Sequence, residues 1–199
     1  MPQIRPRRSS RMIDETVRSA VRRLLIDRGY QAMTIEQVAK CTGVAKTAIY
    51  RRWRSKAEMV FEVAVHGGSI AAPADTGSVG GDLRVLVGHV LALLSDDAVR
   101  GAMPGLIADL RADRDLGERF QRCMIDPERR VVAAILGRAK ERGEISSQAC
   151  PAQIHAQLLG TLFAWVYLVG EPPADDLADR VTDALVAAAG APPNKETDP

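Results

Sequence analysis

The stretch TIEQVAKCTGVAKTAIYRRWRSK, residues 34–56, decides the fold of this chain. Thr34 and Gln37 have the spacing of a capping box, which predicts that a helix begins at the threonine. Gly43 interrupts this short helix and permits a left-handed turn. A second short helix follows over residues 44–53. The spacing therefore predicts two short helices joined by a tight turn.

The two predicted helices separate apolar from polar side chains. Five apolar positions are spaced to face inward: Val38, Ala39, Val44, Ile49 and Trp53. The opposite face of the second helix carries i, i+4 pairs made of cations, a hydroxyl and a phenol: Lys46, Thr47, Tyr50 and Arg51. Such side chains hydrogen-bond to phosphates and to base edges in a major groove. The pattern favours a helix–turn–helix on duplex DNA, and two unrelated short helices around a glycine are the alternative.

Charge is distributed unevenly along the chain. Residues 1–60 hold fourteen Lys and Arg against five Asp and Glu, a net charge of +9, whereas residues 61–199 carry −7. A small basic end on an acidic body indicates a polyanion-binding module joined to a part with another task. A solvated basic face without a partner would give the same count.

Helical periodicity extends over the rest of the 199 residues. A first helix over residues 11–28 ends at Gly29, and Ser55 begins a fourth helix. A Gly-, Pro- and Ala-rich loop is expected over residues 67–81. Later helices are expected over residues 82–94, 102–111, 116–142 with a break at Pro127, 151–169 and 175–189. No alternation typical of strands stands out, so the fold class is all-α.

The run GYQAMTIEQVAKCTGVAKTAIYRRWRSKAEMV, residues 29–60, resembles the DNA-binding segment of the TetR family of bacterial transcriptional regulators. A softer likeness to one carboxy-terminal subtype of that family lies in RDLGERF, RAKERGEI and LVGEPP. The resemblance implies a basic arm and a three-helix, helix–turn–helix DNA-binding domain in residues 1–55. Residues 56–199 would then form a larger helical domain for effector binding and dimerisation.

Site residues follow from this resemblance and from the basic residues beside the second helix. The recognition helix is expected at residues 45–51, and the expected DNA contacts are Thr34, Lys46, Thr47, Ala48, Tyr50, Arg51, Arg52 and Lys56. Ala45 stands where the family often has Ser, which removes a hydroxyl cap. Trp53 stands where Phe is usual, and its indole N–H needs a partner if buried.

The leading segment, residues 2–11, contains four arginines and little apolar content. It is expected to be disordered in the free protein and to lie along phosphates or in a minor groove on DNA. A solubilising tail without a function is the alternative.

The body of the chain is expected to bind a second copy and a small molecule. Residues 151–169 and 175–189 could form a four-helix dimer interface with their copies, although they could also be plain monomer core. The candidate effector pocket consists of large or adaptable side chains, with His89 and Tyr167 as polar anchors. Its members are His89, Met103, Leu106, Phe120, Met124, Phe163, Trp165 and Tyr167, for each of which core packing is the simpler interpretation.

Several classes of function find no support in the sequence. The three histidines are far apart, and no HExxH, GxSxG, Walker or GxGxxG motif occurs, so we expect neither an enzyme nor a metal or cofactor site. The three cysteines make neither a disulfide framework nor a zinc site, which fits a reduced cytoplasm. The longest apolar run, residues 158–170, is shorter than a membrane span, and the start lacks the apolar core of a signal peptide.

These observations predict a homodimeric repressor that binds a near-palindromic double-stranded operator and responds to a small-molecule effector of unknown identity. Two alternatives remain at this point. The chain could be a helical small-molecule carrier with a vestigial basic head, or an adaptor that binds protein partners through residues 151–189.

Overall fold

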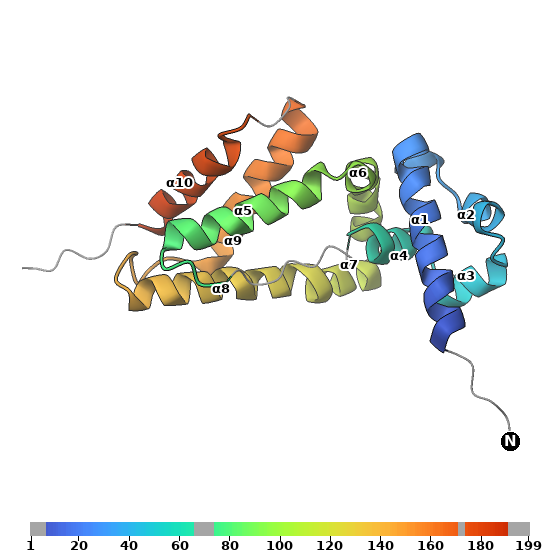
Figure 1. The fold of residues 1–199 in the computed structure, drawn as a ribbon, viewed down its shortest axis with the longest axis horizontal. Coiled ribbons are helices and arrows are strands. Elements are labelled where there is room, and N and C mark those ends of the chain that lie inside the picture. Colours follow the sequence, from blue (N-terminus) through green and yellow to red (C-terminus); the bar gives the residue numbers. More distant parts are fainter. Residues whose placement is uncertain (1–6, 66–73, 171–173, 191–199) are drawn as a thin grey trace, which may run out of the picture. The chain divides into compact units, whose positions relative to one another are not determined.

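The computed structural model describes residues 7–65, 74–170 and 174–190, with side chains from Asp14 onward, and every regular element in these ranges is a helix (Figure 1). The chain is divided into two compact units. Unit 1 comprises Met1–Ser69 and Asp96–Phe120, and unit 2 comprises Ile70–Ser95 and Gln121–Pro199. Unit 1 therefore includes residues 96–120, beyond the boundary expected at residue 55. The expected division by function remains a prediction.

Unit 1 is built around its first helix, with α2 and α3 on one side and α6 on the other (Figure 1). Its elements are α1 (Arg7–Ala32), α2 (Ile35–Thr42), α3 (Lys46–Arg52), α4 (Lys56–Val60), the π-helical turn η1 (Phe61–Val65), α6 (Asp97–Ala112) and α7 (Arg114–Phe120). The expected stop at Gly29 is a bend inside α1, because the glycine takes φ 72° and ψ 173° and helix resumes to Ala32. The segment expected to be a disordered arm is helical backbone from Arg7, and residues 2–6 lie outside the described part.

Polar contacts reinforce the packing of α6 on α1. Asp96 caps α6 by accepting hydrogen bonds from the Ala98 and Val99 amides, and its carboxylate also pairs with Arg22 at 2.6 Å. Burial alone would raise the pKa of Asp96, but the Arg22 hydrogen bond and the two amides lower it overall. The buried Tyr30 donates its hydroxyl to Asp109 of α6, and burial together with this bond raises the pKa of Tyr30. The two helices are thus joined by ion pairing and by a buried phenol.

Unit 2 is a second group of helices with its own apolar core. Its elements are α5 (Val79–Ser95), the π-helical turn η3 (Gln121–Ile125), α8 (Asp126–Glu141), α9 (Pro151–Ala164), the π-helical turn η4 (Trp165–Val169) and α10 (Leu177–Ala189). The break expected near Pro127 within residues 116–142 is confirmed, because α8 begins at Asp126 and Pro127 occupies its first turn, where the missing N–H costs no hydrogen bond. The expected loop also ends earlier, since α5 begins at Val79. Part of that loop, residues 67–73, lies outside the described residues.

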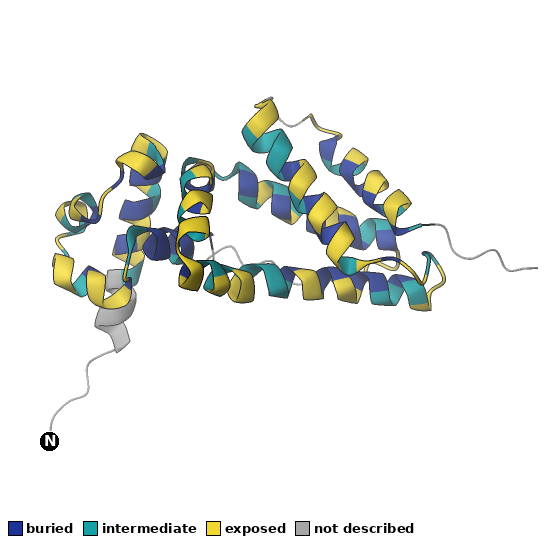
Figure 2. Ribbon diagram, turned by 180° about the vertical axis from the view of Figure 1, so that it is seen from behind, coloured by how far each residue is buried: buried dark blue, intermediate teal, exposed yellow. Residues whose placement is uncertain are grey.

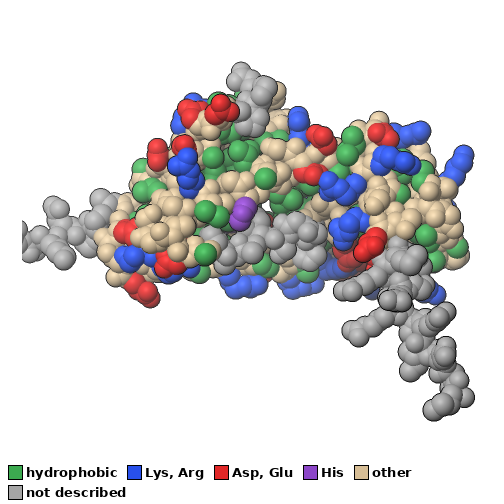
Figure 3. Space-filling model, viewed as in Figure 1, with side chains coloured by type: hydrophobic (Ala, Val, Ile, Leu, Met, Phe, Trp, Pro, Cys, Tyr) green, Lys and Arg blue, Asp and Glu red, His purple; other side chains and the backbone are tan. Residues whose placement is uncertain are grey.

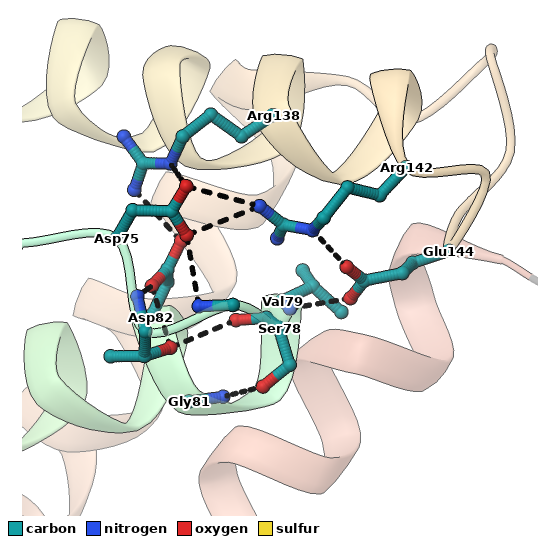
Figure 4. A network of polar contacts seen from close by, with 10 residues as sticks. Asp75, Ser78, Val79, Gly81, Asp82, Arg138, Arg142 and Glu144 are labelled. Atoms are coloured by element: carbon teal, nitrogen blue, oxygen red, sulfur yellow. Dashed lines mark hydrogen bonds and ion pairs between the residues drawn. The ribbon is translucent and has the colours of Figure 1, made fainter.

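A polar cluster holds the start of α5 against the end of α8 (Figure 4). Asp82 is fully buried, pairs with Arg138 at 2.8 Å and accepts a hydrogen bond from the Thr76 amide at 2.8 Å. Burial alone would raise the pKa of Asp82, but the Thr76 and Arg138 hydrogen bonds bring it below the usual range. Glu144 accepts a hydrogen bond from the Val79 amide at 2.6 Å and also pairs with Arg142. These contacts explain why the helix begins at Val79.

Helix α9 and the turn η4 form one continuous apolar segment of 19 residues. With a mean hydropathy of 1.3, this helix is long and apolar enough to cross a membrane by length and composition alone, a test that the core helix of a soluble protein also passes. The helix is longer than the apolar run at residues 158–170, because its first turns also include polar residues before that run. One side of the helix is buried in unit 2, and the residues on it are Ile154, His155, Leu158 and Leu162. The other side of the helix is exposed within this chain (Figure 2).

Candidate nucleic-acid interface

The turn between α2 and α3 has the geometry that its sequence predicts. Thr34 accepts the Gln37 amide at 3.2 Å, and the Gln37 side chain accepts the Thr34 amide at 2.9 Å, so the predicted capping box is present. Gly43 ends α2 with φ 69°, and its amide donates to the Ala39 carbonyl at 2.9 Å. A Cβ at Gly43 would meet nothing within 4 Å, so the positive φ, rather than space, requires glycine here.

Helix α3 has a buried side and an exposed side. Ile49 is 1% exposed and Trp53, which follows the helix, is buried, whereas Tyr50 is 44% exposed. Lys46, Thr47 and Arg51 are exposed with Tyr50, and Ala48 is half-buried. Ala45 precedes the helix without a side-chain cap, as its methyl group requires. Four of the residues expected to contact DNA, Lys46, Thr47, Tyr50 and Arg51, are therefore accessible on α3.

Two cations of α3 are paired with carboxylates of the same chain. Lys46 contacts Glu36 of α2, and its hydrogen bond lowers the pKa of Glu36 while the carboxylate raises the pKa of Lys46. Arg52 contacts Asp14 of α1. Sequence analysis missed both carboxylates, because Glu36 and Asp14 stand 10 and 38 residues away from their partners. In the free chain these groups oppose contact of Lys46 and Arg52 with phosphate.

The two residues expected at helix amino termini already have structural roles. The Lys56 ammonium donates to the Tyr30 carbonyl at 3.0 Å and lies 4.1 Å from the centre of the Tyr30 ring. The Thr34 oxygen caps α2, although its hydroxyl proton can still be donated to a phosphate. Both positions stay predictions as DNA contacts.

The segment directly after α3 is held by two carboxylates. The Trp53 indole N–H donates to Glu62 at 2.9 Å, so this buried tryptophan has the partner that its burial requires. The Arg54 amide donates to Glu58 at 2.6 Å. Arg119 of α7 pairs with both carboxylates, and its hydrogen bond to Glu58 is the main cause that raises the pKa of Arg119. Only the Ser55 capping position signalled a role for Glu58 in the sequence.

The surface of unit 1 is consistent with a polyanion-binding role. Figure 3 shows Lys and Arg side chains gathered on its visible face, with fewer acidic side chains among them. On unit 2 the same view shows cations and carboxylates mixed. The visible charge pattern agrees with the uneven charge of the sequence.

Two family profiles match this chain. Residues 17–63 match the profile described as "Bacterial regulatory proteins, tetR family", and residues 73–185 match "Tetracyclin repressor-like, C-terminal domain". The chain belongs to the TetR family. It is a helix–turn–helix transcriptional regulator from a family of non-enzymatic proteins. Membership implies DNA binding and ligand-responsive regulation, and it identifies the 19-residue apolar helix as part of the regulator's helical body.

Relatives of this TetR-family regulator align with it over most of its length and most of their own length. The uncharacterized HTH-type transcriptional regulator Rv1556 of Mycobacterium tuberculosis is 28% identical over 165 residues, 82% of this chain and 81% of its own. The DNA-binding transcriptional repressor TetR of Mycobacteroides abscessus is 29% identical and is matched over 86% of its length and 82% of this chain. The crystal structure of the TetR family transcription regulator SCO0332 has a TM-score of 0.64 at 26% identity, covering 88% of this chain and 97% of that chain.

The residues predicted for the effector pocket belong to both units of the regulator. Unit 1 contains Met103 and Leu106, which are buried, and Phe120, which is half-buried; unit 2 contains His89, Met124, Phe163, Trp165 and Tyr167. In unit 2 the Phe163 and Tyr167 rings stack with centroids 4.5 Å apart, and the Tyr167 hydroxyl donates to the Leu94 carbonyl at 3.3 Å. The Trp165 indole nitrogen is buried and has no hydrogen-bond partner among the residues that the structure describes. The pocket as a whole stays a prediction.

One cavity opens elsewhere, in unit 1 at the end of α3. It has a volume of about 480 Å³ and is lined by Asp14, Arg18, Arg52, Trp53, Glu62 and Val63, none of which was predicted for the effector. Among the described residues, no group of three or more His, Cys, Asp or Glu is placed to hold a metal ion. The buried His155 pairs with Glu128 at 3.0 Å and joins α9 to α8.

Proposed function

We propose that this regulator is a homodimeric repressor that binds a near-palindromic operator through two copies of α3 and leaves DNA when a small molecule binds. The observation that carries the proposal is the exposed face of α3, where Lys46, Thr47, Tyr50 and Arg51 lie beside one another. The name of the Mycobacteroides abscessus relative, a DNA-binding transcriptional repressor, supports repression as the output.

The α3 face suits a major groove by its chemistry. Arg51 offers a planar fork of N–H groups to guanine, and Thr47 offers a hydroxyl and a methyl group. Tyr50 and Lys46 add a phenol and an ammonium, which lies 5.7 Å from the phenol ring centre. Thr34, Ala48, Arg52 and Lys56 complete the proposed contact set at its edges. The proposed dimer places the two α3 helices about 34 Å apart, one turn of DNA.

The dimer is proposed to form through residues 151–189. The exposed side of α9 is a stripe of small and amide residues at helical spacing: Ala152, Gln153, Ala156, Gln157, Gly160 and Thr161. Small side chains allow two helices to approach closely, and Leu168, 76% exposed, and Val169, 51% exposed, continue the segment. An apolar helix with one side uncovered is explained by a second copy of the chain.

The effector is proposed to bind in the helical body, among the aromatic side chains at the end of α9 and in η4. The buried Trp165 N–H lacks an acceptor among described residues, which costs about 1–3 kcal/mol. An oxygen of the effector could supply that acceptor, while the Phe163 and Tyr167 rings supply apolar contact. Effector binding acts only through a difference in affinity between the DNA-binding state and the released state. We place this function in the cytoplasm.

The test is binding of the purified protein to the DNA upstream of its own gene, followed by fluorescence anisotropy. Lys46→Ala and Tyr50→Ala should each abolish specific binding, while size-exclusion chromatography shows an unchanged oligomer. Arg114→Ala is the matched control, because Arg114 is an exposed cation of α7 that pairs with Glu118. Affinity should fall steeply with salt as counterions return to the DNA. Specific binding that survives both substitutions would show that α3 is not the reading helix, and a wild type that binds small molecules but no DNA would favour a carrier.

A further inference from the structure

Arg119 of α7 joins two carboxylates, those of Glu58 and Glu62, which lie four residues apart along the chain. Its Nη1 contacts Glu58 of α4, and its Nη2 donates to Oε1 of Glu62 in η1 at 2.7 Å. The Glu58 side chain is only 9% exposed, so its charge depends on this partner more than a surface carboxylate would. A planar guanidinium can donate to two carboxylates at once, which an ammonium does less well.

The second oxygen of each carboxylate holds the chain where the recognition helix ends. Oε2 of Glu62 accepts the Trp53 indole N–H at 2.9 Å, and Oε2 of Glu58 accepts the Arg54 amide at 2.6 Å. Trp53 and Arg54 are the two residues that directly follow α3. Arg119 therefore binds directly to the two carboxylates that hold the Trp53 indole and the Arg54 amide at this end of the helix.

Arg119 also stands at the point where the chain leaves unit 1. Phe120 is the last residue of that unit, and Gln121 begins the next segment of unit 2. The Phe120 ring packs on Phe61 of η1, with centroids 5.2 Å apart and planes at 55°. Arg119 and Phe120, the last two residues of unit 1 before the chain enters unit 2, therefore both contact the α4–η1 segment. Because they are covalently joined to residue 121, a displacement of that residue is transmitted to them.

We propose that Arg119 is a positioning residue for DNA binding: through Glu58 and Glu62 it holds the carboxyl end of α3, and it passes a change in unit 2 to that helix. The inference rests on the proposed function, because it assumes that α3 reads DNA. It assigns the link between unit 2 and the carboxyl end of α3 to the Arg119 side chain and the carboxylates of Glu58 and Glu62. A residue that merely stabilised unit 1 would change stability without changing the local environment of Trp53.

The first experiment needs no DNA. In a Trp165→Phe background Trp53 is the single tryptophan, since the chain has two, and its indole N–H gives one NMR signal. Arg119→Gln should shift this signal and raise its hydrogen-exchange rate about tenfold, because Glu62 loses a charge-assisted partner. Arg119→Lys keeps the positive charge but lacks the planar guanidinium, so its signal position and exchange rate should fall between those of wild type and Arg119→Gln. Glu62→Gln should shift the same signal, which provides a second variant if Arg119→Gln folds poorly.

The second experiment measures affinity for the upstream DNA in the same variants. Arg119→Gln should weaken binding about tenfold, with partial recovery in Arg119→Lys, whereas Arg114→Gln, with the same charge change on the same helix, should bind like wild type. An unchanged Trp53 signal, or a shifted signal with unchanged DNA affinity, would overturn the proposal. Absence of DNA binding by the wild type would instead reject the proposed function, and the NMR comparison would still decide whether Arg119 holds Trp53.

Discussion

Gly101 of α6 lies so close to Leu25 of α1 that a Cβ built on the glycine would stand 2.5 Å from the Leu25 carbonyl oxygen. The two helices therefore touch through backbone at this crossing. Gly105, one turn later, lies equally close to a side chain of α1, since a Cβ there would stand 2.4 Å from the Tyr30 ring. Close approach of α6 to the first helix depends on these two missing side chains.

Replacing Gly101 with alanine should destabilise the protein by about 2 kcal/mol, because the added methyl group overpacks a backbone contact. Thermal denaturation should show a melting temperature lower by about 5 °C. Gly88→Ala in α5 is the matched control, since a Cβ there meets nothing within 4 Å, and helix propensity should make it neutral or stabilising. Equal melting temperatures for the two variants would contradict the backbone contact.

Asp82→Asn should destabilise the folded chain by about 2 kcal/mol at pH 7, because Arg138 loses the nearer of its two carboxylate partners and keeps only Asp75 at 3.8 Å. The pKa of Asp82 is lowered in the folded state, so its stabilising effect is present above the unfolded pKa and is lost as pH falls through the folded value. The difference between wild type and variant should therefore shrink as pH falls below about 4. Urea titrations at several pH values measure it, and a difference independent of pH would be inconsistent with the ion pair.

Glu36→Gln should strengthen binding to non-specific duplex DNA about threefold, because the carboxylate no longer competes with phosphate for Lys46. The slope of log affinity against log salt should become steeper by about one. Glu15→Gln, at an exposed position of α1, changes the net charge equally without touching α3. If both variants gain affinity to the same extent, total charge explains the effect and the Lys46–Glu36 contact does not.

Gly160→Glu should convert the proposed dimer into a monomer, because a charged side chain at the exposed stripe of α9 would be buried between the two copies of that dimer. A Cβ at Gly160 meets nothing within 4 Å, so the isolated chain accommodates the change. Light scattering after gel filtration gives the mass, with Ala92→Glu on the exposed side of α5 as control. A wild type that already elutes at the 21.5 kDa of one chain would reject the interface.

The amino-acid sequence alone determined the all-α class, the helix–turn–helix and the family. These rest on neighbours in the chain: the Thr34 capping box, the positive φ at Gly43 and the alternation of Ile49 and Tyr50 between buried and exposed faces. Such features are encoded by residues three or four apart, so one sequence reveals them.

Only the tertiary structure decided which carboxylates meet the cations around α3. Asp14 reaches Arg52, and Arg119 reaches Glu58 across 61 residues, because helix packing brings distant segments together. Packing also assigned the predicted effector residues to two different units, and it left one side of α9 uncovered. Periodicity states which face of a helix is apolar, but the partner of that face depends on how the helices cross, which local spacing does not encode.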